Sequence, residues 1–340
     1  MLLSKRGILK IMKKPNYFFL MLMFIVSIVI AGCSEEAEGQ DKPEGKGKYP
    51  DKPIEVIVAF NAGGGTDVAA RTILNYAEKY VGSSFAVINK PGAAGEIGFT
   101  SLAGAPDNGY TIGMINPPTT LLHPIQRPNE VKYNLDDFSL IANIVSDPGA
   151  FVVNADSQIN SLEDLFEEAK KRKLNMAYGG PGTSEALTLR RAEEMKDVEF
   201  NKIPFEGTSP AVAALMGGHV DVLITNASEV ISQYEDKKIK VLAVGSEEKM
   251  DLMPDVPTYK EEGLDLTQIS MRGIAAPKGV SKEQVEFLAD ALKKTMEDEE
   301  FIKKATEMAL PLDYMGPEEY KEFLENYNDE LVEEFERNPW

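Results

Sequence analysis

From residue 49 onward, short runs rich in β-branched residues alternate with stretches of helical spacing. The expected strands are 54–60, 85–89, 111–115, 140–145, 151–153, 175–178, 201–205, 220–225, 240–244 and 269–275. The expected helices are 66–81, 161–172, 183–195, 209–216 and 227–234, followed by two or three helices within 281–338. This alternation predicts an α/β fold, with parallel or mixed sheets covered by helices on both faces.

The chain has 340 residues, which is more than one hydrophobic core usually holds, so we expect two lobes. The strands and helices between 150 and 245 are enough for one complete lobe. The last strand and the terminal helices have no strands of their own and should return to the first lobe. We therefore assign 49–147 plus 271–340 to lobe 1 and 148–270 to lobe 2, with a hinge where the chain crosses twice.

The formal net charge of −19 makes nucleic acid and anionic membrane surfaces poor partners. An anionic ligand would then have to be held locally, by backbone dipoles. A single cysteine excludes a disulfide, a zinc cluster or a redox pair within the chain, and two histidines disfavour a histidine-rich metal site. We expect no cofactor, no bound metal and a monomer.

The first 32 residues have the features of a signal peptide. Five positive charges precede residue 17, and an uncharged, mostly apolar run follows from Tyr17 to Ala31. This run is shorter than the roughly 20 residues that a membrane span needs. The alternative is an uncleaved anchor helix.

The run ends in Ile30-Ala31-Gly32-Cys33, which resembles the lipobox of bacterial lipoproteins. That resemblance implies that Cys33 is lipidated and becomes the new N-terminus. Residues 34–48 contain no large apolar residue, so 33–48 are expected to form a flexible tether. The protein should then be lipid-anchored on the extracytoplasmic face of the cell membrane.

The loop at 61–67 joins a strand to a helix and contains three successive glycines. Glycines let several backbone N–H groups point into one concavity, and the helix that follows offers its positive end to an anion. No lysine follows as in a Walker loop, and no G-x-G-x-x-G is present, so a small anion such as a carboxylate is favoured over a nucleotide. The alternative is a glycine-rich turn without a ligand.

Three further loops, 89–96, 179–184 and 206–210, also lie between a strand and a helix. Ligands of open α/β sheets lie outside the carboxyl ends of the strands, so two such edges facing each other form a ligand cleft. On the strand 220–225, Asp221 and Thr225 share one face. Asp221 would hold a ligand-bridging water or cap a neighbouring loop.

Several motifs together resemble the solute-binding proteins of tripartite tricarboxylate transporters, the extracytoplasmic receptors of the Bug type. They are Tyr49–Ile54, Phe60–Asp67 with Arg71, Asn89–Ala93, Ala105–Thr111, Gly217–Asp221, Pro254–Thr258 with Glu262-Gly263, and Gly273–Pro277. The resemblance implies a two-lobed fold of the periplasmic-binding-protein class (type II), with a ligand cleft and a hinge between lobes. It also implies capture of a small carboxylate, a di- or tricarboxylate or related organic acid, for a transporter with one large and one small membrane subunit.

The resemblance also implies which residues bind the ligand. The residues carried over by motif are Ala62, Gly63, Thr66, Asp67, Thr183, Ser184 and Asp221, and the candidate loops and strand add Gly64, Ala93, Gly182 and Thr225. Met271-Arg272 stands where the family frequently has a tryptophan, and Arg272 would either meet a ligand carboxylate or form a hinge salt bridge.

An enzyme is not expected. No G-x-S-x-G elbow is present, His219 lies at a strand entrance, and His123, before a proline, is interpreted as a loop residue. A ligand-sensing receptor that presents the bound acid to a signalling partner is the alternative to transport. The neighbouring genes would separate the two.

Overall fold

Residues 49–340 are described here from a computed structural model. The predicted signal peptide (1–32), the predicted lipidation site Cys33 and the predicted tether (33–48) lie outside the described residues. Within 49–340, no helix combines the length and the apolar character that a membrane crossing requires.

Lobe 1 is built on a mixed sheet with the strand order β2-β1-β3-β9-β4. Its strands are β1 (Ile54–Val58), β2 (Phe85–Asn89), β3 (Thr111–Ile115), β4 (Phe138–Asn154), β9 (Ile269–Pro277) and β10 (Leu312–Met315), which pairs with β4. β1 is parallel to β2 and β3, whereas β9 is antiparallel to β3 and β4. The helices are α2 (Gly65–Val81), α3 (Glu96–Ala103), α4 (Thr119–Gln126), α9 (Lys282–Met296), α10 (Glu299–Glu307) and α11 (Pro317–Arg337), with short 3-10 turns at Ala93–Gly95 and Leu135–Asp137.

Lobe 2 continues from the second half of β4, in the order β4-β7-β5-β6. Its strands are β5 (Asn175–Tyr178), β6 (Asn201–Pro204), β7 (Val222–Asn226) and β8 (Ile239–Val244), which also pairs with β4. Its helices are α5 (Leu162–Lys171), α6 (Ser184–Lys196), α7 (Thr208–Met216) and α8 (Ile231–Glu235), with the 3-10 turn η4 at Ala227–Val230. β5 is parallel to β6 and β7, so these three strands end at the same edge.

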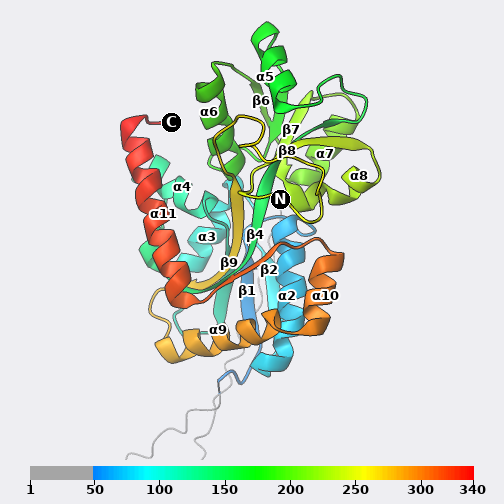
Figure 1. Cartoon of the computed structure of the whole chain (residues 1–340). Coiled ribbons are helices and arrows are strands. Elements are labelled where there is room, and N and C mark those ends of the chain that lie inside the picture. The colour runs from blue at the N-terminus through cyan, green and yellow to red at the C-terminus, as the bar shows by residue number, and fades with distance from the viewer. Residues whose placement is uncertain (1–48) are drawn as a thin grey trace, which may run out of the picture. The chain divides into compact units, whose positions relative to one another are not determined.

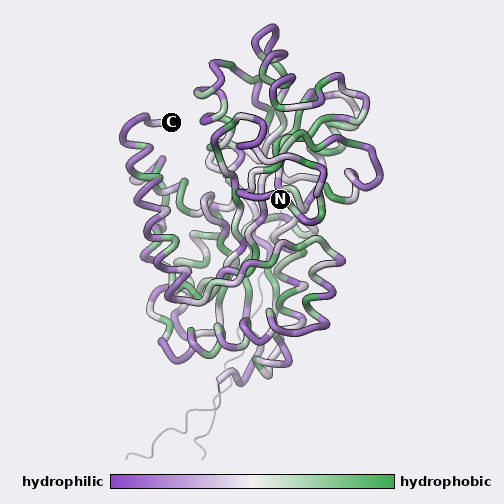
Figure 2. The backbone as a smooth tube through the Cα atoms, in the orientation of Figure 1, coloured by the Kyte–Doolittle hydropathy of each residue, from purple (hydrophilic) through white to green (hydrophobic). Residues whose placement is uncertain are grey.

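Alternation along the strands gives each lobe two hydrophobic layers. Val56 and Val58 of β1 face the layer that α2, α9 and α10 cover, and Ile57 faces the layer of α3, α4 and α11. The same division occurs in lobe 2. Phe151 of β4 faces the layer that α5 and α6 cover, and Val152 faces the layer of α7 and α8. Figure 2 shows hydrophilic residues along the outer helix α11 and hydrophobic residues toward the sheets. The α/β, two-lobed fold expected from the sequence is confirmed.

β4 and β9 are the two strands that connect the lobes, and they run side by side through the middle of Figure 1. β4 was expected as two strands, 140–145 and 151–153, and that expectation was wrong. The strand is continuous because Pro148 lies where β4 changes sheets: Pro148 still pairs with Ile269 of β9, and Gly149 already pairs with Asn226 of β7. The missing N–H of proline is tolerated at such a junction.

Two elements of lobe 1 were not expected from the sequence, α4 and β10. The interpretation of His123 as a loop residue was wrong, because His123 lies in α4 and is buried. Its Nδ1 is 3.1 Å from the hydroxyl oxygen of Tyr133, and burial lowers the pKa of the imidazole to about 4. Pro124, which follows, is tolerated inside this short helix.

Candidate ligand cleft

A cavity of about 150 Å³ lies at the carboxyl ends of strands from both lobes. Lobe 1 contributes residues that follow β1, β2 and β3, and lobe 2 contributes residues that follow β5, β6 and β7. Three helices begin in its wall, with Gly65 of α2, Ser184 of α6 and Thr208 of α7. Because helix N-termini carry unpaired N–H groups and partial positive charge, this wall favours an anion.

The first loop reaches the cavity through Gly64 and Thr66. The loop turns through a hydrogen bond of 3.1 Å from the Gly64 N–H to the carbonyl oxygen of Asn61. The hydroxyl of Thr66 accepts a hydrogen bond of 3.0 Å from the Asn116 amide, which fixes the loop against the end of β3. Ala62 and Gly63, two other predicted ligand residues, are exposed and do not line the cavity.

Asp67 does not line the cavity either, because its carboxylate is used to hold the loop in shape. It accepts hydrogen bonds from the Gly63 N–H (2.9 Å), from Nε of Arg71 (3.0 Å) and from Nδ2 of Asn89 (2.9 Å). Desolvation by burial is outweighed by these hydrogen bonds, so the pKa of Asp67 lies below its ordinary value. The structure therefore places Asp67 behind the loop.

The second loop has an unusual backbone. Ala93 (φ 49°) and Ala94 (φ 51°) both adopt left-handed conformations, which non-glycine residues rarely do. Ala94 lines the cavity. Ala93, the predicted ligand residue, lines a neighbouring hollow that shares Ala94 and Glu206 with the main cavity and also contains Arg127.

The third loop brings Thr183 and Ser184 to the cavity, both of them buried. The Thr183 hydroxyl caps α6: it accepts a hydrogen bond of 3.3 Å from the Ala186 N–H and donates one of 2.8 Å to the Gly180 carbonyl. Gly182 is buried but does not line the cavity. A Cβ there would lie 2.6 Å from the ring of His123, so Gly182 lets this loop approach α4 of the other lobe closely.

Thr225 lies near the carboxyl end of β7, and Asp221 lies just before the strand begins. Thr225 lines the cavity, and its hydroxyl is 3.0 Å from that of Thr208. Asp221 lies at the strand's entrance, away from the cavity, where it accepts hydrogen bonds from Nη2 of Arg172 (3.0 Å) and from the Asn175 N–H (2.7 Å). Two roles were considered for Asp221, holding a ligand-bridging water and capping a neighbouring loop. These contacts correspond to the second, because they fix a neighbouring segment.

Ten polar residues that line the cavity were not among the ligand residues predicted from the sequence. They are Asn61, Asn116, Thr119, Tyr178, Glu185, Glu206, Thr208, Asn226, Glu229 and Ser270. A signal was present for several of them, because Asn116 and Asn226 directly follow the expected strands 111–115 and 220–225, and Glu206 lies in a loop already recognised as a candidate. Glu229 and Ser270 reach the cavity only through the fold, from η4 and from β9.

Arg272 does not line the cavity. It is 1% exposed, and its guanidinium lies 2.8 Å from Oδ2 of Asp147 and 3.0 Å from Oε1 of Glu229. Desolvation opposes its charge, but the two carboxylates outweigh that penalty and raise the pKa of Arg272. Two roles were considered for Arg272, contact with a ligand carboxylate and a hinge salt bridge. The structure shows the salt bridge.

The fold and this cleft define a class: two α/β lobes joined by crossing strands, with a ligand-sized cavity between strand ends, are the architecture of periplasmic binding proteins. Residues 69–333 match the model of the tripartite tricarboxylate transporter family receptor, TctC, and the chain belongs to this family. Members of this family are receptors rather than enzymes and act outside the cytoplasm.

Three known proteins illustrate the similarity. A UPF0065 protein from the gbd 5′ region of Cupriavidus necator is 31% identical over 81% of this chain and 84% of its own length. The periplasmic binding protein BugD is 27% identical, with a TM-score of 0.77 over 85% of this chain and 98% of its own. MatC from Rhodopseudomonas palustris, solved with bound malate, shares the fold at 23% identity, with a TM-score of 0.75 over 85% of this chain and 99% of its own.

Proposed function

We propose that this protein captures a small carboxylate, a di- or tricarboxylate or a related organic acid, and delivers it to a tripartite tricarboxylate-type transporter with one large and one small membrane subunit. It acts by binding and not by catalysis. The malate bound to MatC supports the choice of a carboxylate.

The observation that carries the proposal is the wall of the cavity. The N-termini of α2 from lobe 1 and of α6 and α7 from lobe 2 meet there, with the glycine-rich loops around them. Backbone N–H groups from both lobes are then available to one carboxylate ligand. Gly64, Thr66, Thr183, Ser184 and Thr225 are the predicted residues that we retain as ligand contacts.

Binding should favour a closed arrangement of the lobes, because only that arrangement allows contacts from both sides at once. We propose that the lobes comprise 49–147 plus 271–340 and 148–270. The change of partners along β4 between Pro148 and Gly149 and the start of β9 at Ile269 support these boundaries. The hinge would lie in these two strands.

We further propose that the protein works as a monomer on the extracytoplasmic face of the membrane, held by a lipid on Cys33 after removal of residues 1–32. The apolar run before the cysteine and the small residues next to it support this anchor. Expression in a bacterial host and mass spectrometry of the mature N-terminus would test it: a Cys33→Ser variant should lose both the lipid mass and the membrane fraction.

A thermal-shift screen of the purified full chain tests the binding function. The panel contains citrate, shorter di- and tricarboxylates, aromatic acids and amino acids, with neutral sugars and nucleotides as controls. A ligand at 1,000 times its dissociation constant should stabilise the fold by about 4 kcal/mol. Stabilisation by a sugar or a nucleotide, without any response to acids, would reject the proposal.

A further inference from the structure

The charges inside the cleft do not match a ligand that is only an anion. The charged side chains that line the cavity are Glu185, Glu206 and Glu229. Glu229 contacts Arg272 at 3.0 Å, but that single guanidinium is shared with Asp147. Within residues 49–340, neither Glu185 nor Glu206 forms a salt bridge with a lysine, arginine or histidine.

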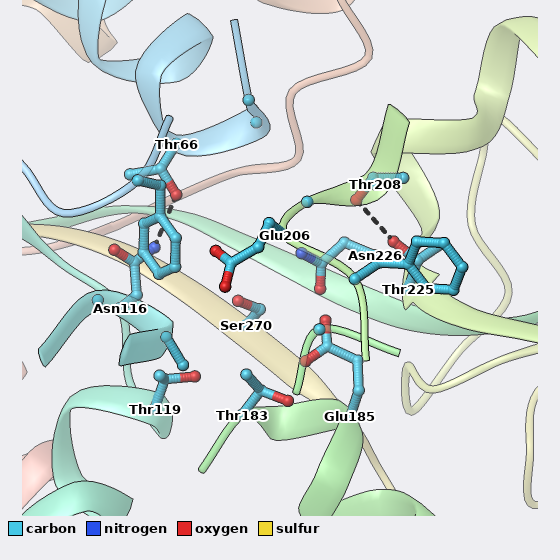
Figure 3. A pocket seen from close by; sticks show the side chains of 18 of the residues that line it. Thr66, Asn116, Thr119, Thr183, Glu185, Glu206, Thr208, Thr225, Asn226 and Ser270 are labelled. Atoms are coloured by element: carbon cyan, nitrogen blue, oxygen red, sulfur yellow. Dashed lines mark hydrogen bonds between the residues drawn. The ribbon is translucent and has the colours of Figure 1, made fainter. Parts of the chain in front are cut away.

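Glu185 lies in the first turn of α6 and faces the cavity (Figure 3). The Ser184 hydroxyl donates a hydrogen bond of 3.3 Å to its carboxylate, and the Glu185 backbone and the Thr183 hydroxyl also stabilise the charged form. Desolvation by burial raises the pKa of Glu185, and the negative charge of Glu229 raises it further. A carboxylate in such a place is stabilised by a cation that enters with the ligand.

A second, independent feature indicates that the ligand carries a hydrogen-bond donor. Asn226 is 8% exposed and lines the cavity, and its Oδ1 has no partner within the described residues. The amide nitrogen Nδ2 lies 3.4 Å from a Glu229 carboxylate oxygen, which is an acceptor, and this places Oδ1 on the opposite side of the amide. Figure 3 shows Oδ1 directed toward the space that the Glu185 and Glu206 carboxylates also face.

A metal ion is the other cation to consider. Among residues 49–340, no group of three or more histidine, cysteine, aspartate or glutamate side chains is placed to hold one. A protonated amine needs fewer carboxylates and supplies the N–H donors that Asn226 Oδ1 requires. A quaternary ammonium would supply the charge but no donor.

We propose that the ligand is a small carboxylate that also carries a protonated amino group, held by Glu185 and Glu206 and donating a hydrogen bond to Asn226 Oδ1. The helix N-termini of α2, α6 and α7 then hold the carboxylate end. This inference rests on the proposed function and narrows its ligand class.

Isothermal titration of the full chain with matched pairs of acids tests the inference. The pairs are L-aspartate with succinate, L-glutamate with glutarate, and 4-aminobutyrate with butyrate; each pair differs by one amino group. The aminated member of the best-bound pair should bind about 10- to 100-fold more tightly, the range expected for a charge-assisted hydrogen-bond site. Glu185→Gln and Glu206→Gln should each reduce that preference, whereas Glu163→Gln, an exposed glutamate on α5 of the same lobe, should leave it unchanged.

The outcomes separate the two proposals. Equal or tighter binding of the unaminated acids would overturn the amine subsite and leave the carboxylate receptor standing. Tight binding of putrescine, a diamine without a carboxylate, would support the subsite and contradict the carboxylate function. Binding of Mg²⁺ or Ca²⁺ alone, lost in Glu185→Gln, would assign the glutamates to a metal and overturn the inference. Failure of every acid to bind would overturn both.

Discussion

Arg272 on β9 and Asp147 on β4 form a salt bridge of 2.8 Å between Nη1 and Oδ2, and both side chains are almost completely buried. The pair lies just before the point where β4 passes from the sheet of lobe 1 to that of lobe 2. Glu229 of lobe 2 contacts the same guanidinium, and Ser228 donates its backbone N–H to Asp147 at 3.2 Å. The two lobes are thus connected by a buried network of charges next to the cleft.

Replacing Arg272 by methionine should be strongly destabilising. The substitution leaves Asp147 buried without a cation, which costs about 3–5 kcal/mol in comparable buried pairs. Urea unfolding gives the change in free energy. Arg172→Met is the matched control, because Arg172 forms its salt bridge with Asp221 at the surface, where such pairs contribute about 0–1 kcal/mol. Similar stabilities of the two variants would contradict the role assigned to Arg272.

Gly65 and Gly64 provide a matched pair at the start of α2. A Cβ on Gly65 would lie 2.1 Å from Oε1 of Glu229 in the other lobe and 2.8 Å from Nη2 of Arg272, whereas a Cβ on Gly64 meets only the Asn61 carbonyl at 3.2 Å. Gly65→Ala should therefore force the lobes apart and weaken ligand binding about 10-fold or more, the affinity equivalent of an overpacking penalty of about 1–3 kcal/mol. Gly64→Ala should have a smaller effect.

Titration calorimetry of both variants, with the tightest acid of the panel, measures this difference. Thermal unfolding without ligand checks that each variant is folded. Equal losses of affinity would show that contact between Gly65 and Glu229 is not part of the binding-competent state. The larger Gly64→Val substitution should weaken binding more than folding if the amides of this loop contact the ligand.

Asp67 should contribute stability that depends on pH. Its folded-state pKa lies below its ordinary value, so the folded state favours the ionised carboxylate. That stabilisation is complete above the unfolded-state pKa of about 4 and is lost as the pH falls through the lower folded-state value. The wild type should therefore be about 1–3 kcal/mol more stable than Asp67→Asn at pH 7, which is the usual cost of losing a buried hydrogen-bond partner. This difference in the free energy of unfolding should shrink below about pH 4. A margin that does not change with pH would contradict the assignment.

His123 should show a pH dependence over a higher range. Its folded-state pKa is about 4 and its ordinary value is 6.5, so between these values the unfolded state binds a proton that the folded state does not. Stability should fall as the pH is lowered through this range, by about 3 kcal/mol. In His123→Gln that loss should be absent, so the difference between variant and wild type should move in favour of the variant at low pH. Urea unfolding at pH 7, 5.5 and 4 measures the free energy of unfolding of both proteins. If the two free energies changed with pH in parallel, the burial of a neutral imidazole would be contradicted.

Much of the fold could be predicted from the sequence, because the apolar periodicities of strands and helices are local. β2, β3 and β5 have the bounds that the pattern indicated. The pattern failed where a local signal was overruled by the tertiary structure. Pro148 suggests a break in β4, and only the change of partner sheet explains why the strand continues. Pro124 suggested a loop around His123, although burial against Tyr133 stabilises a helix there.

The site could be predicted less well, because composition locates loops but does not say which side chains they turn inward. Thr66 and Thr183 line the cavity as helix starts on strand-end loops. Asp67 follows Thr66 directly, yet its side chain points back toward Arg71. Asp221 was expected to share a strand face with Thr225, but it lies just before β7, and the length of that strand separates it from the cavity.

The most direct test is a titration of the isotopically labelled protein, followed through its backbone N–H resonances, with the tightest carboxylate of the panel. The account predicts shifts at both edges of the cleft, in 64–66 of lobe 1 and in 183–184 and 208 of lobe 2, at the same ligand concentration. Saturable shifts confined to one lobe, or located away from these strand ends, would contradict it.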